Sequence, residues 1–118
     1  MPRVSSSVAS RNRRKKILKS AKGYWGGKSK LLRTAKDAVR KSLSYAYRDR
    51  KVRKRDFRRL WITRIGIAAK KEGLSYSQLM KGLKNANIQI NRKMLAEIAV
   101  HYDKGFAQLS QMVLSEIK

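Results

Sequence analysis

Apolar side chains recur with a helical period mainly in the second half of the chain. Phe57, Trp61, Ile65 and Ala68 are three or four residues apart, the spacing that places side chains on one face of a helix. Similar spacings predict three further helices, and we expect the Met, Leu and Phe residues of this half to form a core. The three sets are Leu79, Met80 and Leu83; Met94, Leu95, Ile98 and Ala99; and Phe106, Leu109, Met112, Val113 and Ile117.

Residues that typically begin and end helices separate these apolar sets. Gly73 is predicted to end the first helix, because glycine readily adopts the left-handed conformation found after a C-terminus. Ser75 with Gln78 three residues later is the pattern of a capping box. Asn91 and Asp103 are the predicted N-caps of the last two helices.

The first half of the chain has no comparable apolar stripe. Residues 1–10 show no periodicity and are predicted to be extended and unstructured. Residues 11–22 favour a helix, but a weak one, because like charges repel at helical spacing. The segment "GYWGG" (23–27) predicts a sharp bend, since glycines tolerate positive φ.

From Lys28 to Ile65 there is no glycine or proline, which predicts one helix of roughly 57 Å at ~1.5 Å per residue. Its acidic residues each precede a base by one turn, the favourable orientation for an ion pair. The predicted pairs are Asp37–Lys41, Asp49–Arg53 and Asp56–Arg59. In no stretch do apolar and polar residues alternate for long enough to indicate a strand, so we expect an all-α fold. We expect a basic arm of two helices with a Gly-rich bend (1–56) and a small globular helical domain (57–118).

The net charge of the chain indicates what kind of partner it binds. The chain has 31 Lys and Arg against 7 Asp and Glu, a net charge of +24. A small soluble domain typically carries a net charge of roughly 2–8. Of these residues, 24 bases and only 3 acids lie in the first 70 positions. This excess indicates a polyanionic partner, with nucleic acid the first candidate and an anionic membrane the second.

The densest charge lies between Arg48 and Arg59, where eight of twelve residues are basic. At ~100° per residue these side chains surround most of a helix, which leaves no wide apolar face for lipid. Such a helix suits a crevice in folded RNA better than a DNA groove, although a wrapped DNA assembly would also serve. A DNA-packaging protein is therefore the alternative, but the Lys/Ala/Pro-rich tail that would favour it is missing.

Aromatic residues lie among the charges. Unstacked RNA bases are commonly held on aromatic rings, so Tyr24, Trp25, Tyr45 and Tyr47 are candidates for stacking. The alternative role for these rings is packing within the protein. Tyr24 and Trp25 could anchor the turn, and for Tyr45 and Tyr47 packing is favoured over stacking.

Little in the chain points to catalysis. The absence of Cys excludes disulfides, zinc knuckles and a thiol nucleophile. The single histidine, His101, is expected to be a structural residue near a helix end. No carboxylate pair, phosphate-cradling Gly loop or nucleophile–base spacing stands out, so we expect no enzyme, no metal and no cofactor. The Ser- and Arg-rich start resembles a transit peptide, but the basic character continues far beyond it and predicts mature sequence.

Three stretches carry a family resemblance. "RRKKILKSAKGYWGGKSKLLRTAKDAV", "YAYRDRKVRKRDFRRLWITRI" and "GLSYSQLMKGLKNANIQINRKMLAEIAV" resemble the bacterial ribosomal protein L20 family of the large subunit. The resemblance runs from Met1 to about Val100. The chain departs from the common pattern at "VSSSVAS", at Trp25 and Gly27, and in the last stretch from His101.

The resemblance implies a basic helical arm within large-subunit ribosomal RNA and a helical domain on an RNA junction. It implies a structural role in early subunit assembly, beside neighbouring ribosomal proteins, in a bacterial cytoplasm or an organelle. Some members bind their own messenger RNA, which we do not assign here. We expect neither a membrane partner nor a homo-oligomer. The candidate RNA contacts are Arg3, Arg11, Arg13, Arg14, Lys15, Lys16, Lys19, Lys22, Tyr24, Trp25, Lys28, Lys30, Arg33, Lys36, Arg40, Arg48, Arg50, Lys51, Arg53, Lys54, Arg55, Arg58, Arg59 and Arg64.

Overall fold

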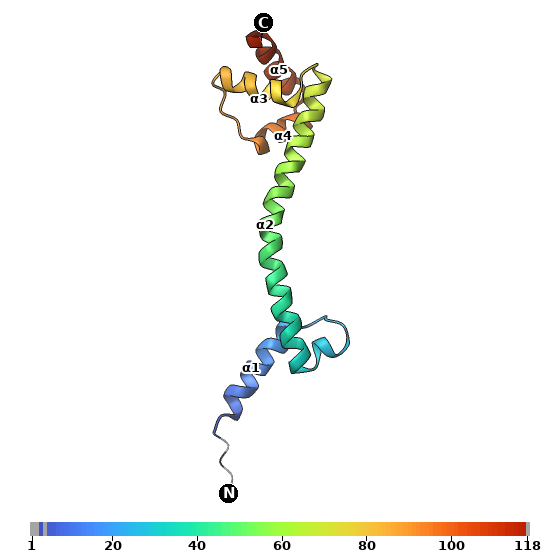
Figure 1. Cartoon of the computed structure of the whole chain (residues 1–118), viewed down its shortest axis with the longest axis vertical. Coiled ribbons are helices and arrows are strands. Elements are labelled where there is room, and N and C mark those ends of the chain that lie inside the picture. The colour runs from blue at the N-terminus through green and yellow to red at the C-terminus, as the bar shows by residue number, and fades with distance from the viewer. Residues whose placement is uncertain (1–2, 4, 118) are drawn as a thin grey trace. The chain divides into compact units, whose positions relative to one another are not determined.

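The computed structural model describes Arg3 and residues 5–117, and this part contains helices and turns but no strand (Figure 1). The predicted all-α class is confirmed. The elements are α1 (Ser7–Ser20), the 3₁₀ helix η1 (Gly26–Ser29), α2 (Leu32–Lys71), α3 (Tyr76–Asn85), α4 (Arg92–His101) and α5 (Asp103–Ile117). The chain forms two compact units, and the boundary between Lys51 and Val52 falls within α2. We refer to them as the first unit and the second unit.

In the first unit, α1 begins earlier than its sequence predicts. The expectation that residues 1–10 are unstructured is wrong for Ser7 to Ser10, which are helical. The carbonyl of Ser6 accepts a hydrogen bond from the Ser10 amide at 3.0 Å, so the first helical turn closes before Arg11, the first basic residue of α1. No Gly or Pro interrupts this segment, and nothing local therefore opposes the extra turn.

The predicted bend between α1 and α2 is confirmed. Gly23 and Gly26 have φ angles of +84° and +57°, which residues with a Cβ rarely adopt. The next helix starts at Leu32 and not at Lys28, because Gly26 to Ser29 form a 3₁₀ turn first. The Thr34 hydroxyl donates to the Gly27 carbonyl at 2.9 Å and joins this turn to the start of α2.

In the second unit, a single hydrophobic core joins the last part of α2 to the three shorter helices. Helix α5 packs against both α3 and α4 (Figure 1). Partly buried residues, among them Trp61, Met80 and Ile98, surround this core. The buried members are Ile65, Ala69, Leu74, Leu79, Leu83, Leu95, Ala96, Phe106 and Val113.

Most predicted helix ends of this unit are confirmed. Ser75 and Gln78 form both hydrogen bonds of a capping box, at 2.9 and 3.3 Å. The Asn91 side chain accepts from the Met94 amide at 2.9 Å. Gly73 follows α2 with φ +77°, as a glycine C-terminal cap does. Asp103, however, is the first residue of α5 and not the residue before it. Its carboxylate therefore lies in the first turn, where the negative charge interacts favourably with the positive end of the helix dipole.

The predicted core is too large by several residues. Met94 and Met112 are 58% and 55% exposed, and Phe57 and Ile117 are about half exposed as well. The apolar residues of α5 cover more than one face of that helix, and only the face with Phe106 and Val113 meets other helices. Phe57 touches Trp61, with ring centroids 6.2 Å apart, but lies outside the core.

Separate folding of the C-terminal part remains a prediction. We expect a fragment from Phe57 onward to fold alone, because the whole core lies within it. We expect residues 1–50 to stay largely unstructured without RNA, because among their described positions only Ala21 and Ala35 are buried hydrophobic side chains. Circular dichroism of the two fragments tests this. A cooperative thermal transition in the N-terminal fragment would contradict the prediction, with the full chain as the reference.

Candidate nucleic-acid interface

Positive charge is concentrated in the first unit. Residues 1–51 contain 17 Lys and Arg but only Asp37 and Asp49 as acids. Residues 52–118 contain the remaining 14 bases and 5 acids. The bases of the second unit are densest between Arg53 and Arg64, on its part of α2.

Every predicted basic contact is exposed, including Arg3 ahead of α1. Six candidates lie on α1, which buries no residue: Arg11, Arg13, Arg14, Lys15, Lys16 and Lys19. Lys22, Lys28 and Lys30 lie in the bend and around η1. The candidates on α2 are Arg33, Lys36, Arg40, Arg48, Arg50 and Lys51 in the first unit and Arg53, Lys54, Arg55, Arg58, Arg59 and Arg64 in the second.

Carboxylates within the chain neutralise very few of these bases. Among the described residues, only two of the candidates are within ion-pair distance of an acid: Arg48 with Asp49 at 2.8 Å and Arg59 with Asp56 at 3.6 Å. The hydrogen bond between the first pair raises the pKa of Arg48 and lowers the pKa of Asp49. The other candidate bases are thus available to an external anion.

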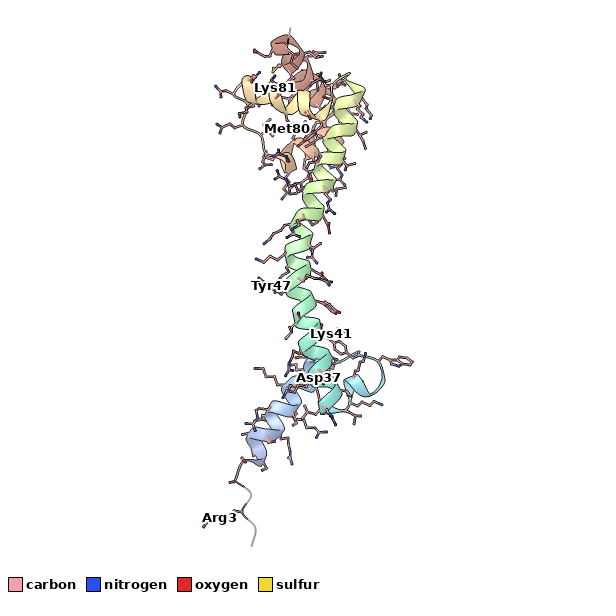
Figure 2. The ribbon with its side chains drawn as sticks, viewed as in Figure 1. Arg3, Asp37, Lys41, Tyr47, Met80 and Lys81 are labelled. Atoms are coloured by element: carbon pink, nitrogen blue, oxygen red, sulfur yellow. The ribbon has the colours of Figure 1, made fainter. Side chains whose placement is uncertain are left out.

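Two of the three predicted acid–base pairs do not form. Asp49 pairs with the preceding Arg48 and not with Arg53 four residues later. Lys41 lies 5.7 Å from the centre of the Tyr45 ring, and no pair with Asp37 is present. Both residues can be found on α2 in Figure 2. Exposed pairs at helical spacing contribute only about 0.2–0.5 kcal/mol, so a neighbouring hydrogen bond or ring contact easily replaces them.

The four aromatic candidates differ in how they are held. Trp25 is 91% exposed, which rules out a role as packing anchor within the described structure, whereas Tyr24 is half-buried. The Arg48 guanidinium lies 4.7 Å from the centre of the Tyr45 ring. Tyr47, labelled in Figure 2, has the Lys51 ammonium 5.4 Å from its ring centre. Both tyrosines therefore contact basic side chains and are not in the core.

A second basic surface lies in the second unit and was not predicted. Lys81, Lys84 and Arg92 line an open cavity of about 630 Å³, together with apolar residues such as Met80 and Ile88. The Arg92 side chain donates to the Tyr76 hydroxyl at 2.9 Å, which fixes its position. Lys81 and Lys84 are three residues apart, a spacing that places both side chains on one face of a helix. This sign of a basic surface was easy to miss, because the second half of the chain has a low density of charge.

Other kinds of site find no support in the described residues. No group of three His, Cys, Asp or Glu lies close enough there to hold a metal ion. No described helix combines the length and the apolar character that crossing a bilayer requires. His101, at the end of α4 as predicted, is exposed and 3.5 Å from Glu97.

Known proteins match this chain over most of its length. Residues 3–109 match the family model described as "Ribosomal protein L20", which extends past the point where the resemblance was expected to fade. The chain is also 62% identical over 112 residues to "Large ribosomal subunit protein bL20" of Carboxydothermus hydrogenoformans, across 95% of this chain and 96% of that protein. Matches of this extent and identity show that the chain belongs to the ribosomal protein L20 family.

Proposed function

We propose that this protein is a structural constituent of the large ribosomal subunit that binds ribosomal RNA directly and supports early subunit assembly. The observation that carries the proposal is the row of exposed bases on α1 and α2, nearly all without a carboxylate partner. Many exposed basic side chains without carboxylate partners bind a dense array of phosphates well, because each contact releases counterions. Membership of the L20 family supports the ribosome as the source of that RNA.

The proposal assigns different tasks to the two units. The first unit and the basic part of α2 would lie among RNA segments and reduce the repulsion between their phosphates. The second unit would dock on folded RNA as a compact body, with Lys81, Lys84 and Arg92 as its contacts. Neighbouring ribosomal proteins are the further partners we propose, and the place of action is the ribosome. No chemical step is part of this role.

Competition binding tests the proposed function. Labelled large-subunit RNA is challenged with transfer RNA and with duplex DNA across a salt series. We expect ribosomal RNA to remain the preferred partner as salt rises, because shape recognition persists when nonspecific electrostatic binding weakens. If the three competitors were equivalent and lost binding together, charge alone would explain the interaction. Preference for duplex DNA would favour a DNA-packaging role instead.

A further inference from the structure

The first unit contains an open cleft whose lining unites aromatic rings with lysines. Tyr24, Trp25 and Lys28 come from the bend and η1, and the other side comes from one stripe of α2. The cleft has a volume of about 410 Å³, within the roughly 300–1,000 Å³ that small-ligand sites occupy. The α2 residues of the lining are Ala38, Lys41, Ser42 and Tyr45.

The small side chains of that stripe keep the floor of the cleft open. Ala38 and Ser42 are four residues apart and therefore lie on the same face of α2, next to the larger Lys41 and Tyr45. A large residue at either position would take up part of the cleft volume. The lining is mostly apolar, as the faces of a flat aromatic ligand require.

The bend holds the backbone of the aromatic pair while it leaves the Trp25 ring uncovered. Gly23 and Gly26, both with positive φ, flank Tyr24 and Trp25. The Trp25 carbonyl accepts a hydrogen bond from the Lys28 amide at 3.3 Å. Trp25 has the largest exposed fraction of the large hydrophobic side chains in the described structure, so both ring faces are accessible to a partner.

Charge around the cleft selects an anionic occupant. Lys28 and Lys41 belong to the lining, and the Arg48 guanidinium lies against the Tyr45 ring at 4.7 Å. No carboxylate belongs to the lining. Rings beside cations, without acids, are what proteins use to stack a base and hold its phosphate.

We propose that this cleft binds a single unpaired nucleotide of RNA, with its base stacked on Trp25 and its phosphate at Lys28 and Lys41. Paired bases stay stacked inside a duplex and cannot offer a face to the tryptophan, whereas a bulged or looped nucleotide can. Base–aromatic stacking tolerates any base, so the site recognises the unpaired state and not a sequence. This inference rests on the proposed function, which makes RNA the partner.

The test compares an RNA duplex carrying one bulged adenosine with the same duplex fully paired. In the full chain, Trp61→Phe leaves Trp25 as the only tryptophan. We expect both duplexes to bind with similar salt dependence, as followed by the anisotropy of labelled RNA. The bulged duplex should bind more tightly than the paired duplex. It alone should quench the Trp25 fluorescence, because stacking brings a base onto the indole ring.

Two variants decide whether the cleft is responsible. Trp25→Ala should weaken binding of the bulged duplex by about 5- to 150-fold, the range that corresponds to one stacked base. It should leave the paired duplex within about twofold, and Trp25→Phe should recover part of the loss. Tyr102→Ala is the control, because Tyr102 is an exposed aromatic that belongs neither to the cleft lining nor to the stacking candidates, and it should affect both duplexes equally and slightly.

Equal quenching by both duplexes would overturn the proposal. So would equal losses of binding for both duplexes in Trp25→Ala, or a loss in Tyr102→Ala as selective for the bulged duplex as that of Trp25→Ala. In each of these cases, persistent salt-dependent binding of the duplexes leaves the proposed RNA-binding function intact. Loss of binding to large-subunit RNA in the competition experiment would instead defeat both.

Discussion

Gly82→Ala is expected to destabilise the second unit by about 1–3 kcal/mol, although alanine is the better helix former. A Cβ at Gly82 would overlap the Val113 Cγ1 atom and lie only 3.1 Å from Val113 Cβ. Val113 is fully buried on α5, so it has no free space to occupy. The two helices α3 and α5 would have to separate and loosen the core between them.

Urea unfolding of the full chain measures this effect. Trp61 packs against the core and reports its unfolding through fluorescence when Trp25→Phe removes the other tryptophan. Gly66→Ala is the matched control, because it makes the same change inside a helix of the same unit and nothing lies within 4 Å of the added Cβ. There the helix propensity acts alone and stability should rise by roughly 0.5–1 kcal/mol.

A double variant shows whether the clash is the cause. Val113→Ala alone should cost about 2 kcal/mol, at ~0.8 kcal/mol for each buried methyl group. In that background the overlap with Cγ1 is gone and only the Cβ of residue 113 stays close, at 3.1 Å, so the cost of Gly82→Ala should shrink to a small fraction of its value in the native chain. Additive effects of the two substitutions would show that α3 and α5 do not meet as closely as the structure places them.

Replacing Arg53, Lys54 and Arg55 together with alanine is expected to flatten the salt dependence of RNA binding by about two to three units of slope. Each lost phosphate contact removes about 0.7–0.9 from the slope of log K against log salt. All three side chains are exposed and have no acidic partner in the described structure. The advantage of the native chain over this variant should therefore shrink roughly 30-fold between about 50 and about 200 mM salt.

A charge-preserving change separates electrostatics from geometry in this experiment. Arg53→Lys with Arg55→Lys keeps the three charges, so the slope should stay near the native value. Affinity should nevertheless fall, because lysine cannot form the two parallel hydrogen bonds that a guanidinium makes with phosphate. An unchanged slope in the alanine variant would place these three side chains in solvent, away from the RNA.

Much of the helical framework could be predicted because its signals are local. The capping box at Ser75, the cap at Asn91 and the stop at Gly73 each depend on atoms within a few residues along the chain. Asn87 was missed although it ends α3 in the same way as a glycine, with φ +57°. Asparagine adopts this conformation less regularly than glycine does, so the residue type alone was a weaker signal.

The RNA contacts were predicted from charge density, and the structure adds that the bases are exposed and mostly unpaired. Neither property is visible in the sequence, where Asp49 appeared to serve Arg53 and in fact pairs with Arg48. Ion pairs on a helix surface differ by tenths of a kcal/mol, so spacing alone does not decide between them. The contacts themselves stay a prediction until RNA binding is measured.

The sequence by itself determined the helical class, the bend at residues 23–27 and the excess of positive charge, because composition and neighbouring residues decide these properties. Only the tertiary structure decided which face of each helix is covered. It exposed Met94 and Met112, buried Ser110, and brought Gly82 against Val113. It also placed Trp25 beside the Lys41 and Tyr45 stripe. The physical reason is that burial depends on which helices meet, and that is a property of residues far apart in the chain.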